Sequence, residues 1–159
     1  AFRSLPKYAV KIVGDGPLLE KVKASVEENQ LQGAEVLGRR PNQEVIGLLK
    51  NARFLVFPSE WYEGFPMILV EALACGTPVI ASDLGSMAEI VEDGRTGLHF
   101  SPGDDVELAG KIDWAWKHPR RMADMGREAR EEFERKYTAE RNYEMLMAIY
   151  EQAGKAARG

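Results

Sequence analysis

Short apolar runs alternate with longer amphipathic segments along the N-terminal part of the chain. The runs have the length and the β-branched or aromatic content of strands. We predict strands, the first of them buried, at Tyr8–Val13, Ala34–Leu37, Phe54–Phe57, Val79–Ala81 and Gly97–Phe100. The segments between them predict helices at Pro17–Asn29, Pro41–Lys50 and Pro66–Cys75, the last ended by Gly76. Strands that alternate with helices in this way predict an α/β fold with a parallel sheet covered on both faces.

The C-terminal part of the chain carries only helical patterns. Asp104 is the predicted cap of a helix that runs to about Lys117. Pro119 opens a second helix that ends near Tyr137, and Thr138 is the predicted cap of a third.

The composition excludes several classes of protein. A chain of 159 residues, 45% of them hydrophobic, is long enough for a single domain, with an α/β part at residues 1–103 and C-terminal helices at 104–159. A net charge of -4 argues against a nucleic-acid-binding protein. One cysteine and two histidines exclude a disulfide framework and argue against a metal site. No apolar run is long enough to span a membrane and no signal peptide opens the chain, so we expect a cytoplasmic location.

Two glutamates, Glu63 and Glu71, are the most informative polar residues. We expect Pro66 at the first helical position, because its fixed φ matches a helix and its missing N–H would have no partner there. Glu63 then lies in the loop before the helix, and Glu71 lies along the helix flank. The amides of Met67 and Ile68 are left at the helix tip, where the helix dipole favours an anion.

These groups form a line of three polar contacts, since the helix rises roughly 7.5 Å from Pro66 to Glu71. A ligand with a hydroxyl-rich group, a phosphate bridge and a second hydroxyl-rich group has the same layout, and a nucleotide-sugar is such a ligand. The alternative is an acid/base pair for glycoside hydrolysis, whose carboxyls face each other across a substrate. Glu63 and Glu71 lie in series along one loop and helix, which disfavours that alternative.

A second candidate is the turn Gly14-Asp15-Gly16 between a predicted strand and helix. It resembles the start of a dinucleotide-binding fingerprint, but Leu19 stands where that fingerprint needs its third glycine. A tight strand-to-helix turn is therefore the preferred interpretation. The turn still follows the carboxyl end of a strand, where open parallel sheets bind ligands.

Other residues have a structural as well as a functional interpretation. Ser86 and Glu89 have the spacing of a capping box, which we prefer to ligand contact. Cys75 lies among small residues with no histidine near it in the sequence, so we predict that it packs and is not a nucleophile. For Trp61 and Tyr62, loop packing is preferred to a role beside a sugar pocket.

Two stretches of the chain carry a resemblance to a known family. VKIVGDGP and VLGRRPNQEVIGLLKNARFLVFPSEWYEGFPMILVEALACGTPVIASDLGSMAEIVEDGRTGLHFSPGD closely resemble the donor-binding half of family-four glycosyltransferases of the GT-B fold. The resemblance implies a Rossmann-like C-terminal domain of a two-domain enzyme, with the active site in the cleft between the domains. It also implies retaining transfer of a sugar from a nucleotide-diphosphate donor, without a metal or a further cofactor.

Carried over by position, the resemblance implies a role for each candidate. Glu63, the predicted catalytic residue, would accept hydrogen bonds from donor-sugar hydroxyls, and Glu71 would hold the ribose diol. The other predicted donor-binding residues are Gly64, Phe65, Pro66, Met67, Gly14, Gly38, Arg39 and Arg40. A solvated basic pair is the alternative for Arg39 and Arg40. The family usually has glycine at the position of Pro66. Proline has no backbone N–H, so this chain has one amide donor fewer there.

In the family no covalent nucleophile is needed. The acceptor attacks from the front side, and the departing phosphate helps to take its proton. Catalysis is therefore mostly positioning and charge stabilisation.

The family pattern also includes parts that this chain lacks. Its donor domain begins with a strand that is central in the sheet, followed by a loop whose Arg and Lys clamp the diphosphate, whereas this chain opens at AFRSLPKYAVKIV. The acceptor domain is absent as well. We therefore expect a fragment truncated at its N-terminal side and inactive alone.

Two other functions remain open at this point: a catalytically silent nucleotide-sugar-binding or interaction module, and a nucleotide-sugar epimerase on the same fold. The expected partners are a nucleotide-sugar and the N-terminal acceptor domain, with peripheral association of the full enzyme at the inner face of a membrane. Tyr143, Met147 and Tyr150 on the last helix are expected to be exposed and to drive self-association, with packing on this domain as the alternative.

Overall fold

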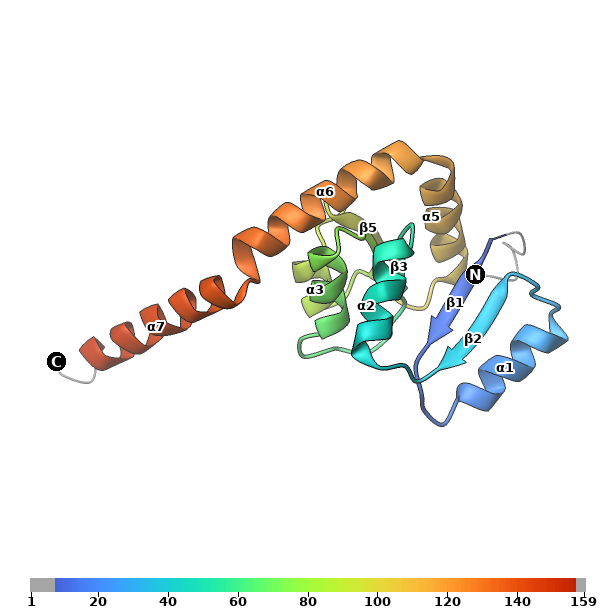
Figure 1. The fold of residues 1–159 in the computed structure, drawn as a ribbon, viewed down its shortest axis with the longest axis horizontal. Coiled ribbons are helices and arrows are strands. Elements are labelled where there is room, and N and C mark those ends of the chain that lie inside the picture. The colour runs from blue at the N-terminus through green and yellow to red at the C-terminus, as the bar shows by residue number, and fades with distance from the viewer. Residues whose placement is uncertain (1–7, 157–159) are drawn as a thin grey trace.

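A computed structural model gives the fold of residues 8–156 (Figure 1). Strands alternate with helices as far as β5, and only helices follow. The elements are β1 (Val10–Val13), α1 (Leu19–Glu28), β2 (Ala34–Gly38), α2 (Asn42–Asn51), β3 (Leu55–Phe57), α3 (Met67–Ala74), β4 (Val79–Ser82), α4 (Ser86–Ile90), β5 (Gly97–Phe100), α5 (Asp105–Lys117), α6 (Pro119–Lys136) and α7 (Ala139–Ala156). The predicted strands and helices are confirmed, with ends shifted by a few residues.

Three of the predicted helix ends have the expected geometry. The Asp104 side chain accepts hydrogen bonds from two amides in the first turn of α5, at 3.0 and 2.8 Å. Gly76 follows α3 in the left-handed region, with φ 68°, which suits glycine at a helix end. The Thr138 hydroxyl precedes α7 and accepts from the amide of Arg141 at 3.3 Å.

The strands are parallel, as predicted, but they form two sheets and not one. One sheet has the order β1-β2, and the other has the order β3-β4-β5. Val10 pairs with Ala34 in the first sheet, and Val79 pairs with both Leu55 and Gly97 in the second. Within residues 8–156, β1 and β3 do not pair with each other.

The main core surrounds β4, all of whose residues are buried. Successive side chains of a strand point to opposite faces of the sheet. Val79 accordingly packs in a cluster with Leu73 of α3, whereas Ile80 packs in a second cluster with Ile112 of α5. The three-stranded sheet is thus covered on both faces, as predicted.

The β1-β2 sheet lies outside this core. Figure 1 shows it with α1 at its side, at one end of the molecule. The prediction of a buried first strand is wrong, because β1 alternates between half-buried and exposed residues and Val13 is 37% exposed. α1 has no buried residue. A two-stranded sheet with one helix offers too few neighbours to exclude water.

An ion cluster around one buried carboxylate joins α6 to the loop before β5. The Glu132 side chain is 4% exposed and lies within 2.6 Å of nitrogen atoms of Arg95, Arg135 and Lys136. Burial alone would raise the pKa of Glu132, but the hydrogen bonds from these cations outweigh it and lower the pKa to about 2. The cluster stabilises the packing of the loop on α6 as long as the carboxylate is ionised.

The last helix projects away from the body of the molecule (Figure 1). Every residue from 139 to 155 is exposed. The predicted exposure of Tyr143, Met147 and Tyr150 is therefore confirmed, and packing on this domain is excluded for them; they are 65%, 38% and 62% exposed.

Candidate functional site

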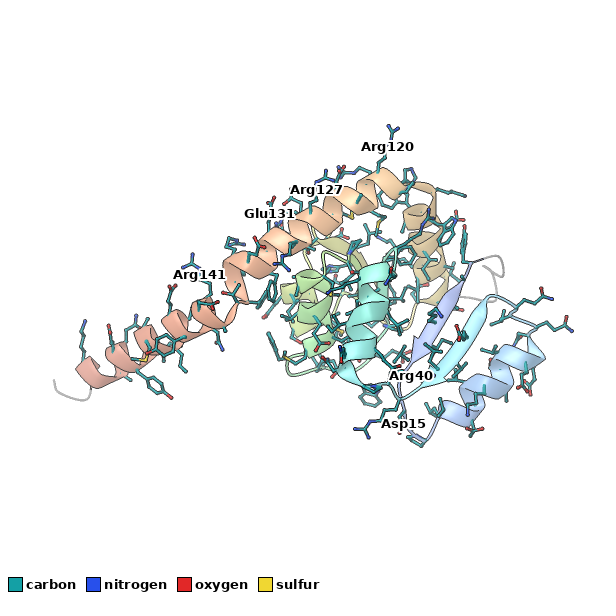
Figure 2. All side chains as sticks on the ribbon, viewed as in Figure 1. Asp15, Arg40, Arg120, Arg127, Glu131 and Arg141 are labelled. Atoms are coloured by element: carbon teal, nitrogen blue, oxygen red, sulfur yellow. The ribbon has the colours of Figure 1, made fainter. Side chains whose placement is uncertain are left out.

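Two of the predicted site residues, both glycines, lie at the carboxyl ends of neighbouring strands. Gly14 comes after β1 and Gly38 ends β2, and the Gly14 amide donates to the Gly38 carbonyl at 3.0 Å. The structure thus brings these two glycines together. Figure 1 shows β1 and β2 pointing toward the start of α2, and Figure 2 labels Asp15 and Arg40 at that same end of the molecule.

The loop that holds Glu63 follows β3 and leads into α3. Pro66 occupies the N-cap position of α3 with ψ 98°, so the expectation that it is the first helical residue is wrong by one position. The extended ψ of Pro66 delays the helix until Met67, while its carbonyl accepts from the Leu69 amide at 3.0 Å. The amides of Met67 and Ile68 still form the start of the helix, where no intrahelical acceptor reaches them.

Glu71 lies on the flank of α3 and is half-buried. Its Oε1 accepts a hydrogen bond of 2.7 Å from the side-chain amide of Asn42, the first residue of α2. This bond joins the segment after β2 to the helix of the second sheet. Neither the composition nor the helical pattern predicts it, since the two residues are 29 positions apart.

Glu63 is held at two points. The Ser59 hydroxyl donates to its carboxylate at 2.8 Å, and the Ser86 hydroxyl donates to its backbone carbonyl at 2.7 Å. The capping-box prediction for Ser86 and Glu89 is therefore wrong. Gly85 takes the N-cap position of α4 without a side-chain cap, and Ser86 binds the glutamate loop. Ser59 and Glu63 both lie in the loop between β3 and α3, where a four-residue spacing has no fixed geometry, so the sequence carries no signal for the first contact.

Apolar side chains around this loop are exposed. Trp61 and Tyr62 are 80% and 81% exposed, and Phe65 and Met67 are more than half exposed. A Cβ placed on Gly85 would lie 3.0 Å from the Tyr62 ring, so this ring rests against the start of α4. Loop packing thus accounts for one face of Tyr62 but not for Trp61.

The remaining candidates are surface or packing residues. Arg39 and Arg40 are exposed, and Arg40 Nη1 lies 3.7 Å from a carboxylate oxygen of Glu44. Cys75 is half-buried against the α3 cluster, and burial raises the pKa of its thiol, which opposes the nucleophilic thiolate form.

A cavity of about 250 Å³ lies elsewhere, beside the residues that precede β3 and β4. Its lining includes Arg53, Pro78 and Met122 and none of the predicted site residues. Among residues 8–156, no group of three or more His, Cys, Asp or Glu side chains is placed to hold a metal ion. None of the described helices is both long and apolar enough to cross a membrane.

Comparison with known proteins identifies the family. The family model described as glycosyl transferases group 1 matches residues 1–132. The chain belongs to this family. It is 35% identical over 145 residues to an uncharacterized glycosyltransferase of Methanocaldococcus jannaschii. This match covers 91% of this chain and 41% of that protein. It is 32% identical over 134 residues to the D-rhamnosyltransferase WbpZ of Pseudomonas aeruginosa, covering 83% of this chain and 35% of that protein.

Solved structures confirm the GT-B assignment of the fold. Sucrose-phosphate synthase from Thermosynechococcus elongatus superposes with a TM-score of 0.86 at 27% identity, over 98% of this chain and 41% of that chain. Anabaena HepE in complex with UDP superposes with a TM-score of 0.81 at 23% identity, over 92% of this chain and 42% of that chain. The chain therefore spans about two fifths of the length of these relatives.

Proposed function

We propose that the chain is the donor-binding part of a glycosyltransferase and holds a nucleotide-diphosphate sugar along the start of α3. The observation that carries the proposal is the pair of carboxylates on either side of the first turn of α3, each already held by a neutral hydrogen-bond donor. Membership of the glycosyl transferases group 1 family supports it, as does the UDP bound in the Anabaena structure of similar fold.

Each group at this site has a chemistry that suits one part of such a donor. Glu71 accepts hydrogen bonds from the ribose hydroxyls, and the amides at the start of α3 face the diphosphate, which the helix dipole favours. Glu63 accepts hydrogen bonds from the hydroxyls of the sugar. Hydrogen bonds to a charged acceptor are the stronger kind, so two fixed carboxylates orient both ends of the ligand.

The proposed reaction is retaining and needs no metal. The protein contributes by fixing the donor and by stabilising charge on the departing diphosphate, and no side chain forms a bond to the sugar. Transfer also needs an acceptor site, which we assign to the rest of the polypeptide. A cytoplasmic location, association with the inner face of a membrane and self-association through α7 stay predictions.

The donor site is tested by titrating the full-length polypeptide that contains this chain with UDP, GDP and ADP in a calorimeter. We expect one of these nucleotides to bind saturably and Glu71→Ala to weaken its binding about ten- to a hundredfold, because a hydrogen-bonded charge is lost. Glu28→Ala, which removes an exposed acid at the end of α1, is the matched control and should leave the affinity unchanged.

Two results would contradict the proposal. Unchanged affinity in Glu71→Ala would remove the ribose role, and no binding of any of the three nucleotides would remove the donor site. A product assay with the nucleotide-sugar separates the other functions, since an epimerase converts the donor without an acceptor and a silent module leaves it unchanged.

A further inference from the structure

The side chain of Asn42 has an unusual use for its position in the fold. Asparagine near a helix N-terminus commonly caps the helix by accepting a backbone hydrogen bond. Here Pro41 occupies the N-cap position of α2 without a side-chain cap, and Asn42 is the first helical residue. Its amide donates instead to Glu71 of α3, at 2.7 Å.

This contact is specific to the Glu71 carboxylate. Among residues 8–156, Asn42 is the one side chain that donates a hydrogen bond to Glu71, and it contacts only Oε1. Oε2 and the second lone pair of Oε1 remain for a ligand, because an ionised carboxylate has about four acceptor sites. An amide donor fixes the carboxylate without cancelling its charge, which a lysine or arginine at this place would do.

The same contact joins two predicted parts of the ligand site. Asn42 follows Gly38, Arg39 and Arg40, the segment at the carboxyl end of β2. Glu71 belongs to the helix that follows β3. Asn42 opens α2, whose Leu49 packs in one core cluster with Leu73 of α3, so this bond adds a polar contact to the α2–α3 packing directly after the β2 segment.

We propose that Asn42 is a positioning residue for nucleoside binding. It holds the Glu71 carboxylate toward the ribose and keeps the segment after β2 in register with the start of α3. This inference rests on the proposed function, and it adds that α3 and the segment after β2 are held together to bind the nucleoside. Asn42 acts through Glu71 and does not itself touch the ribose.

A double-mutant cycle on the full-length polypeptide tests the inference, with UDP, GDP or ADP as the probe, whichever the unchanged protein binds. We expect Asn42→Ala to weaken binding about three- to tenfold, because a hydrogen bond to a charged group is lost. In a Glu71→Ala background the same change should alter affinity by less than about twofold, because the carboxylate that Asn42 positions is gone. The 2′-deoxynucleoside diphosphate should likewise show a smaller effect of Asn42→Ala.

The matched control lies on the same helix. Asn51→Ala changes the last residue of α2, whose amide donates only to the carbonyl of Gly47 at 2.8 Å, and it should leave nucleotide affinity unchanged. Asn42→Asp supplies a second readout, because it places a like charge against Glu71. It should weaken binding more than Asn42→Ala does, and this excess should disappear in the Glu71→Ala background.

The outcomes separate this inference from the proposed function. Weakened binding in Glu71→Ala with normal binding in Asn42→Ala would leave the donor site standing and overturn the positioning role. Independent, multiplicative effects of the two substitutions, or an equal loss in Asn51→Ala, would overturn it as well. If the unchanged protein binds none of the three nucleotides, both proposals fail.

Discussion

The two sheets are built from the same kind of strand and helix, yet only one of them has a closed core. Every residue of β4 is buried and α3 packs on it, whereas no residue of β1 or of α1 is fully buried. β4 has a hydrogen-bonded strand on each side, and β1 has one. β5 also has one neighbouring strand, yet it is mostly buried, because α5 and α6 pack on it. The helices that cover a strand, more than its apolar content or the number of strands beside it, therefore decide how far it is buried.

We call the part built around β3, β4 and β5 the closed half, and β1, β2 and α1 the open half. This difference also divides the candidate site. Glu63, Glu71 and the start of α3 belong to the closed half, and their positions are fixed by packing and by hydrogen bonds. Gly14, Gly38 and the two arginines belong to the open half. For the proposed donor site, this predicts rigid recognition of the sugar and diphosphate, and recognition of the base that depends on how the open half is held.

The largest expected effect comes from truncating a buried leucine side chain of the closed half, with a half-buried leucine of the open half for comparison. Leu73 of α3 is 0% exposed, so Leu73→Ala should destabilise the protein by about 3–5 kcal/mol. Leu19 of α1 is only half-buried, and Leu19→Ala should cost roughly 1 kcal/mol, because part of its surface is already in water. Urea unfolding followed by tryptophan fluorescence measures both. Equal losses would show that the two halves form one core.

The pH dependence of stability gives the second comparison. The pKa of Glu132 is about 2 in the folded protein and close to 4.5 in the unfolded chain, so its contribution is present above about pH 4.5 and is lost as the pH falls toward 2. The loss should be on the order of 3 kcal/mol. Glu132→Gln should flatten the curve of unfolding free energy against pH between 5 and 2.

The control for this prediction is an ion pair of the open half. Glu35 pairs with Lys11 at 2.6 Å, but their side chains are 59% and 54% exposed. Exposed pairs contribute about 0–1 kcal/mol, so Glu35→Gln should leave the acid limb of the curve almost unchanged. A curve that is equally flattened by both substitutions would mean that burial does not distinguish the two ion pairs.

The sequence predicts the elements well because each is specified by its own residues. The alternation of apolar residues, Gly76 after α3 and Asp104 before α5 are local signals, and the structure confirms them. The division into two sheets is not local, since pairing depends on which strands lie side by side.

The contacts that hold the two carboxylates are not predicted from the sequence, for a related reason. Asn42 reaches Glu71 across 29 positions, and Ser86 reaches Glu63 across 23. Each of these donors lies at a helix start, where its residue type also suits a cap, so the local pattern favours the wrong interpretation. Glu63 and Glu71 themselves could be found because their spacing is set by one loop and one helix.

The smallest expected effect concerns the hydroxyl of Ser86. Ser86→Ala removes a 2.7 Å hydrogen bond to the Glu63 carbonyl in the closed half and should cost about 1 kcal/mol of stability. Ser25→Ala in α1 removes an acceptor for a contact of 3.4 Å only, and helix propensity favours alanine, so its effect should be near zero. If Glu63 faces the sugar, Ser86→Ala in the full-length enzyme should slow transfer several-fold while affinity for the nucleoside diphosphate stays the same, because that ligand carries no sugar. Weakened binding of the nucleoside diphosphate with normal transfer would instead place Glu63 beside the nucleotide, and the order of groups along α3 would have to be reversed.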